Sequence, residues 1–155
     1  GMVSVPDDRG LFPSLTVAEH LRLVGSSVDE AAGVFPALAG LAARRAGACS
    51  GGEQQQLAVA LGIVRRPKVL CIDELSMGLA ARVVVELLSG LRALADEGDT
   101  AVLVVEQFVD AVLAVADRGV VLGGGRVIRD EPSEQLLADR AALEAAYLGS
   151  APRRR

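Results

Sequence analysis

The stretch from Cys49 to Gly78 reads CSGGEQQQLAVALGIVRRPKVLCIDELSMG. Its first part is a polar turn with two adjacent glycines that opens an apolar helix, and the helix is expected to end at Pro67. Its second part is the apolar run 69–72, which predicts a strand buried on both faces. Two carboxylates, Asp73 and Glu74, follow this strand. Because ligands bind beyond the carboxyl ends of strands in open α/β sheets, we expect a ligand site there.

The order of these segments resembles that of the ABC-ATPase family. Residues 50–54, Ser-Gly-Gly-Glu-Gln, resemble its signature, and residues 69–74 resemble its Walker B strand. Residues 76–79 follow where that family has its D-loop. Each motif alone is a weak signal, since a chance match in an unrelated α/β protein would produce it, but the three in this order and spacing are specific. The resemblance implies an α/β fold: an incomplete P-loop NTPase core with a helical signature subdomain.

The signature residues are candidates for phosphate binding. Backbone N–H groups at a helix N-terminus favour anions, and glycines let the backbone approach a phosphate closely. The family resemblance implies that Ser50, Gly51, Gly52 and Glu53 contact the γ-phosphate of ATP held by an opposite subunit. The alternative is that Ser50 is an ordinary helix cap.

The carboxylates after the apolar run are candidates for metal binding and catalysis. The resemblance implies that Asp73 orients Mg²⁺, usually through water, and that Glu74 is the general base that polarises the attacking water. The alternative is that both residues only cap a turn at the end of the strand.

Two further segments resemble the branched-chain amino acid, or Liv-type, importer group. Gln107, in Val-Glu-Gln, falls where the family has its switch histidine, although it could simply cap the following helix. Residues 5–17 are similar to that group's Q-loop and its sequel, with Asp7 where Gln or Glu is usual. Residues 144–149 resemble the Liv-type ending, although a plain amphipathic helix would also explain them.

A phosphate-binding loop of the G-x-x-x-x-G-K-[S/T] type does not occur in the sequence. The resemblance therefore covers residues 3–149 and implies the C-terminal two-thirds of such an ATPase domain, without Walker A. We expect residues 1–155 to form a single partial domain. Residues 16–66 are its helical subdomain, and residues 67–150 contribute part of the α/β core and the C-terminal helices.

Composition narrows the function classes. The net charge of −4 and the pI of about 5.0 argue against a nucleic-acid surface. Apolar residues make up 51% of the chain, yet none of the apolar runs approaches the roughly 18–20 residues that span a bilayer. The start of the sequence lacks a signal-peptide pattern. Cys49 and Cys71 lack metal spacing and indicate a reducing cytoplasm, and His20 is expected on a helix surface.

The remaining chain predicts an alternation of helices and strands. Thr16 and Glu19 form a capping-box pattern, so a helix should start near Val17. The other expected elements are a strand end at 2–5, a helix over 29–41 interrupted at Pro36, a helix at 81–97, a buried strand at 101–105, a helix at 108–116, a hairpin turn at 123–125 and a final short helix capped by Ser133 or Asp139.

The resemblance implies an ATP-binding component of an importer for branched-chain or similar amino acids. ATP and Mg²⁺ are its expected cofactors. Its expected partners are a second ABC ATPase subunit and integral-membrane permease subunits, at the cytoplasmic face of the membrane, and the chain is expected to self-associate. The alternative is a non-catalytic, degenerate module that binds a partner ATPase and supplies its signature in trans. Hydrolysis without a partner would favour the enzyme, and ATP-dependent association with an intact ATPase would favour the module.

Overall fold

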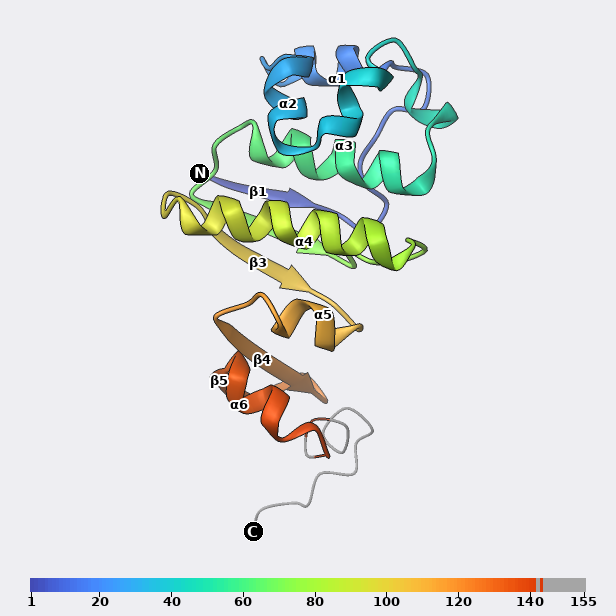
Figure 1. The fold of residues 1–155 in the computed structure, drawn as a ribbon. Coiled ribbons are helices and arrows are strands. Elements are labelled where there is room, and N and C mark those ends of the chain that lie inside the picture. Colours follow the sequence, from blue (N-terminus) through green and yellow to red (C-terminus); the bar gives the residue numbers. More distant parts are fainter. Residues whose placement is uncertain (142, 144–155) are drawn as a thin grey trace. The chain divides into compact units, whose positions relative to one another are not determined.

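The computed structural model describes residues 1–141 and residue 143 (Figure 1). The chain divides into two compact units, residues 1–107 and 108–155, which are described separately. Among the described residues, none of the helices is long and apolar enough to cross a membrane.

The first unit is built on a parallel sheet of three strands. These are β1 (Met2–Val5), β2 (Val69–Asp73) and β3 (Ala101–Val105), in the order β1-β2-β3 (Figure 1). Parallel strands need long crossover connections, and helical segments provide them here. The strand and helix assignments of the sequence analysis are confirmed in this unit, except that the helix that begins at Gly51 ends at Ile63 and not at Pro67, and the fold is α/β as predicted.

One face of the sheet is covered by α3 (Gly51–Ile63). The contact is close at Gly62, where an added Cβ would lie 2.9 Å from Leu70 Cδ1 and 3.2 Å from Val5 Cγ2. Leu70 and Val5 are buried, so neither side chain has room to retreat. The helix that starts with the signature residues is therefore seated directly on β1 and β2. A further helix, α4 (Ala81–Asp96), contacts both α3 and β3.

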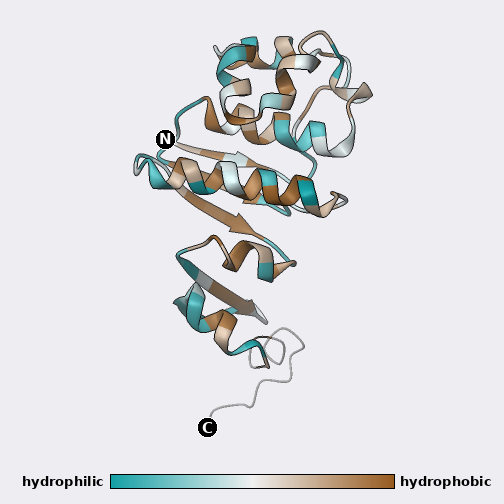
Figure 2. Ribbon diagram, viewed as in Figure 1, coloured by the Kyte–Doolittle hydropathy of each residue, from teal (hydrophilic) through white to brown (hydrophobic). Residues whose placement is uncertain are grey.

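Within the first unit, the other face of the sheet is exposed at β3 and at the start of β1. Leu103 and Val105, which alternate with the inward-facing residues of β3, are 56% and 55% exposed, and Met2 of β1 is 73% exposed. β3 is hydrophobic along its whole length (Figure 2). The prediction of a strand buried on both faces is therefore wrong for β3, whereas Val69 and Cys71 of β2 are half-buried on this face. An apolar run shows which residues avoid water, but it does not show which segment covers them.

Short helices follow β1 in the chain and precede α3. They are α1 (Val17–Leu23), α2 (Val28–Val34) and two 3₁₀ helices, η1 (Pro36–Leu41) and η2 (Ala46–Ala48). The capping box of Thr16 and Glu19 is confirmed, and Ser27 and Glu30 form a second one at α2. The predicted interruption at Pro36 is also confirmed, because a proline lacks the N–H group that would continue α2.

The second unit contains α5 (Val109–Leu113), a two-stranded antiparallel sheet of β4 (Arg118–Gly123) and β5 (Arg126–Pro132), and α6 (Ser133–Ala138). The predicted hairpin is confirmed. Gly124 and Gly125 have φ values of 55° and 74°, the positive pair that a type I′ turn requires. Leu113, Leu136 and Leu143 form the small core of this unit.

The predicted cap of the final helix is wrong at Ser133. The N-cap of α6 is Pro132, without a side-chain hydrogen bond, and the buried Ser133 Oγ has no partner among the described residues. Asp139 is the C-cap of α6, and its carboxylate pairs with Arg129. The segment 144–149, whose sequence resembles the Liv-type ending, lies outside the described residues.

Candidate functional site

The two carboxylates of the apolar run lie at the carboxyl end of β2. Asp73 is the last residue of β2, pairs in register with Val105 and is exposed, and Glu74 follows it. The Glu74 N–H donates to Val105 O at 2.9 Å, which extends the β2–β3 ladder by one bond. Glu74 has a φ of 48°, a left-handed conformation that few residues other than glycine adopt. Such strain at the end of a strand is typical of functional sites.

Glu74 and Gln107 are brought together across the two strands. Gln107 Nε2 donates to Glu74 Oε1 at 3.0 Å, although the residues are 33 positions apart. Glu74 Oε2 has no hydrogen-bond partner among the described residues. The carboxylate is therefore held by one oxygen, and the other can accept from water.

Asp73 fits a supporting role for a metal ion. No group of three or more His, Cys, Asp or Glu residues that could hold a metal ion occurs in the part of the chain that the structure describes. Mg²⁺ is usually bound by one or two carboxylates together with substrate phosphates and water. The exposed Asp73 carboxylate, which pairs with no described residue, suits that arrangement.

The signature residues form the N-terminus of α3. Ser50 is the N-cap: its Oγ accepts from the Glu53 N–H at 3.3 Å, and Glu53 Oε2 accepts from the Ser50 N–H at 2.7 Å. Glu53 also forms an ion pair with Arg44 at 3.3 Å. The Glu53 carboxylate is thus used within the helix start, while Gly51 and Gly52 supply the first N–H groups of the helix.

Two groups of predicted residues remain separate within the first unit. No hydrogen bond between described residues joins Ser50–Glu53 to Glu74 or Gln107. Asp7 also stays apart, since it lies in an exposed turn and its carboxylate accepts from the Asp8 N–H at 2.9 Å.

Arg9 is a residue of this region that sequence reasoning missed. Its Nη1 donates to Gln54 Oε1 and its Nε to Gln55 Oε1, both at 2.9 Å. The loop after β1 is therefore tied to the first turns of α3. The run of three glutamines at 54–56, which begins at the last signature residue, was the only sequence signal for such a clamp.

Glu106 is the second residue that was missed. Its Oε1 accepts from the Ser76 N–H at 2.5 Å, and its Oε2 accepts from the Gln107 N–H at 2.9 Å. The sequence signal was a charged residue directly after an apolar strand.

The prediction that His20 lies on a helix surface is wrong. The side chain is 3% exposed, because the loop that carries Phe12 folds over it. His20 Nε2 accepts from the Phe12 N–H at 2.9 Å, and Nδ1 donates to Thr16 O at 2.8 Å. A neutral ring with its proton on Nδ1 satisfies both partners.

Cys49, the residue before the signature, has a thiol whose pKa is raised above its ordinary value. Burial raises the pKa of this thiol, and the nearby Glu53 carboxylate adds to the effect. Cys49 and Cys71 are both free. Cys49 is therefore a packing residue in its thiol form.

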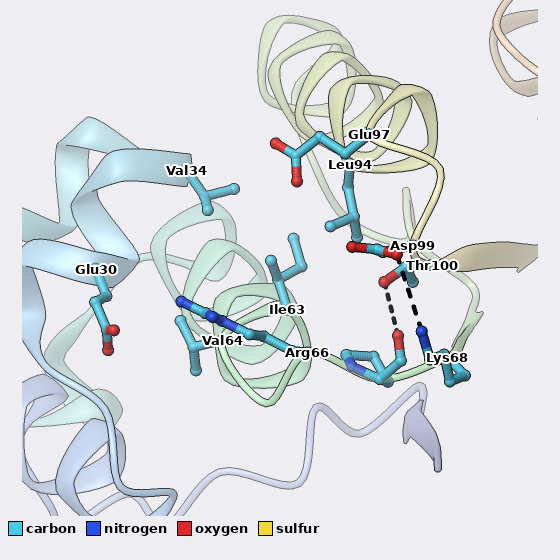
Figure 3. Close-up of a pocket in the computed structure, with 11 residues that line it drawn as sticks. Glu30, Val34, Ile63, Val64, Arg66, Lys68, Leu94, Glu97, Asp99 and Thr100 are labelled. Atoms are coloured by element: carbon cyan, nitrogen blue, oxygen red, sulfur yellow. Dashed lines mark hydrogen bonds and ion pairs between the residues drawn. The ribbon is translucent and has the colours of Figure 1, made fainter.

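A pocket of about 420 Å³ lies at the opposite end of the strands (Figure 3). It is bordered by Lys68, which precedes β2, and by Thr100, which precedes β3 and donates to Pro67 O at 2.7 Å. Lys68 and Asp99 pair at 3.9 Å on its rim. Ligand sites of open α/β sheets lie at the carboxyl ends of strands, so this pocket is not part of the candidate site.

Comparison with solved structures supports the fold. The dimeric ATP-binding cassette MJ0796 bound to ADP and Pi matches with a TM-score of 0.74 and 22% identity, covering 85% of this chain and 62% of the cassette. The cbiO1 structure from Clostridium perfringens, part of the cbiONQ transporter complex, also gives 0.74 at 22% identity, covering 97% of this chain and 67% of that one.

Comparison with curated proteins identifies the family. BraG of Pseudomonas aeruginosa, a high-affinity branched-chain amino acid transport ATP-binding protein, is 36% identical over 94% of this chain. LivF of Archaeoglobus fulgidus, a probable branched-chain amino acid transport ATP-binding protein, is 32% identical over 88%. The chain spans 65% and 62% of the length of these two relatives. The ABC transporter family model matches residues 1–77. On its sequence and its fold, the chain belongs to the ABC transporter family of ATP-binding proteins.

Proposed function

We propose that the chain is part of the ATP-hydrolysing component of an importer for branched-chain or similar amino acids. The observation that carries the proposal is the pair of Glu74 and Gln107 at the carboxyl end of β2, next to Asp73. The likeness to BraG and LivF supports the class of transported substrate.

Glu74 acts as the general base in this proposal. Its Oε1 is held by Gln107, and its Oε2 accepts a hydrogen bond from water and then takes the proton as the water oxygen attacks the γ-phosphorus. The bond between the γ-phosphorus and ADP breaks in the same step. Gln107 has no titratable proton, so it orients Glu74 and does not relay protons.

In this proposal the remaining site residues bind and orient Mg²⁺ and the phosphates of ATP. Asp73 would hold Mg²⁺ through water, and Mg²⁺ would neutralise charge on the phosphates. Gly51 and Gly52 would direct their N–H groups, with the Ser50 hydroxyl, at the γ-phosphate of ATP held by a second ABC ATPase subunit. Glu53 supports this site indirectly, because its carboxylate holds the Ser50 N–H. Glu53 therefore has an indirect part in this proposal, and Asp7, in its exposed turn, stays a predicted cofactor-binding residue.

A chimaera tests the activity. The segment of BraG that precedes its match to this chain is fused in front of residue 1, and ATP hydrolysis is measured. We expect turnover, and Glu74→Gln should reduce it by about 10²- to 10⁴-fold while ATP binding persists. Turnover that Glu74→Gln leaves unchanged would remove Glu74 as the base. A chimaera that binds an intact ATPase only with ATP, but hydrolyses nothing itself, would favour the non-catalytic module.

The transport assignment needs a separate test. We propose that the component works with integral-membrane permease subunits at the cytoplasmic face of the membrane. The chimaera is expressed in Pseudomonas aeruginosa cells that lack BraG, and uptake of radiolabelled leucine is measured. Restored uptake that depends on Glu74 is the expected result. ATP hydrolysis without restored uptake would keep the ATPase and reject the substrate or the permease partner.

A further inference from the structure

Glu106 joins two segments that flank the Glu74 side chain. One is the loop after β2, through the Ser76 N–H, and the other is the second residue after β3, through the Gln107 N–H. Ser76 and Glu106 are 30 positions apart, so the contact is made by the fold and not by local sequence. Hydrogen bonds from N–H groups to an ionised carboxylate are among the stronger ones in proteins.

These contacts close a ring around the candidate base. Gln107 reaches Glu74, Glu74 is two residues from Ser76, and Ser76 returns to Gln107 through Glu106. The loop is tightly turned, since the Met77 N–H donates to Glu74 O at 3.3 Å. Ser76 is only 7% exposed, so the loop has little room to shift. The placement of the Gln107 backbone therefore decides whether its side chain reaches Glu74.

We propose that Glu106 is a positioning residue for hydrolysis, which holds the loop at Ser76 and the Gln107 backbone so that Gln107 keeps Glu74 in its working orientation. This inference rests on the proposed ATPase function. Glu106 does not act on water or phosphate itself, because both of its oxygens accept from the backbone of its own unit. Its effect on turnover passes through Gln107.

The first test uses the 155-residue chain and hydrogen exchange measured by mass spectrometry. Glu106→Ala removes both acceptor oxygens, whereas Glu106→Gln keeps one. We expect faster exchange at Ser76 and Gln107 in Glu106→Ala and an intermediate rate in Glu106→Gln. Glu97→Ala is the matched control, because this residue follows α4 at the amino-terminal ends of the strands (Figure 3). Unchanged exchange at both amides in Glu106→Ala would overturn the inference.

The second test is a double-mutant cycle in the BraG chimaera. Partners that orient metal-ligating side chains typically contribute about 10- to 100-fold, and we expect Glu106→Ala to lower kcat by a similar factor. Because Glu106 acts through Gln107, Glu106→Ala combined with Gln107→Ala should cost no more than the larger single effect. Effects that multiply would overturn the inference and leave the ATPase function intact.

If Glu106 only stabilised the fold, the double-mutant cycle would give a different result. Glu106→Ala would then lower the stability of the chain without a dependence on Gln107, so the cycle would be multiplicative. Glu106→Gln separates the two roles further, because it keeps the size of the side chain and should recover part of kcat. A chimaera with no turnover at all would refute the proposed function, and with it the positioning role of Glu106 in hydrolysis. The exchange experiment would still decide whether Glu106 holds the loop.

Discussion

The close seating of α3 on the sheet can be tested at Gly62. In Gly62→Ala the new Cβ would lie 2.9 Å from Leu70 Cδ1 and 3.2 Å from Val5 Cγ2. Leu70 is fully buried, and valine has little freedom at χ1, so the strands and the helix must separate slightly. Overpacking of this kind costs about 1–3 kcal/mol of unfolding free energy. The gain from replacing a helical glycine by alanine returns about 1 kcal/mol.

Gly33→Ala is the matched control. Gly33 lies in α2 and has no atom within 4 Å of an added Cβ, so it shows the helix-propensity gain without the packing cost. We therefore expect Gly33→Ala to stabilise the chain by about 0.5–1 kcal/mol and Gly62→Ala to destabilise it by up to about 2 kcal/mol. The difference between the two variants isolates the packing cost.

Urea unfolding followed by far-ultraviolet circular dichroism measures this difference. With a urea dependence of about 1–3 kcal/mol per molar, a packing cost of about 2 kcal/mol separates the two midpoints by about 1 M. Transitions recorded at two protein concentrations show whether association contributes. Equal stabilisation by both substitutions would refute the reasoning, because it would mean that α3 does not sit directly on β1 and β2.

Three further predictions follow from other contacts. Ser50→Ala should destabilise the chain by about 1 kcal/mol in the same urea assay, because the Glu53 N–H loses its acceptor; an unchanged midpoint would contradict the capping box. The chain alone should self-associate in light scattering, because Met2, Leu103 and Val105 are exposed on one sheet face; a 16.0 kDa monomer over a wide concentration range would contradict this. The pKa values of Glu19 and Glu30 lie below their ordinary 4.5 because Thr16, and Ser26 with Ser27, donate to the ionised carboxylates. The stabilisation from these caps is therefore complete above pH 4.5 and is lost as the pH falls below it, which helicity measured against a Glu19→Gln/Glu30→Gln control will show.

Local features of the site could be predicted from the sequence. A capping pattern involves residues three positions apart, so Ser50 and Glu53 carry their own evidence for a helix start. An apolar run followed by two acids likewise marks the end of a strand, which places Asp73 and Glu74. Gln107 followed from the resemblance to a known family, and its contact with Glu74 then depended on β2 and β3 being neighbours.

Contacts between distant segments could not be predicted in the same way. Glu106 reaches Ser76 only because of the register between β2 and β3, and no local pattern encodes that register. Arg9 and His20 present the same difficulty, since the partners of one and the burial of the other depend on how the loop after β1 folds over α1 and α3. The exposed face of the sheet was not predicted, because apolar residues in a strand indicate that it avoids water but do not show which segment packs against it.

The loop after β1 is anchored at several points to helices of the same unit. Arg9 donates hydrogen bonds to Gln54 and Gln55 of α3, and the Phe12 N–H donates to His20 of α1. Farther along, the Ala46 N–H donates to Leu15 O at 2.8 Å, so the approach to the signature is fastened to the same loop. A loop that is hydrogen-bonded at several points moves together with the helices it contacts, whereas an unbonded loop can move without them. A displacement of the end of β1 would therefore move α1 and the start of α3 together. The signature residues, which form the start of α3, would move with them.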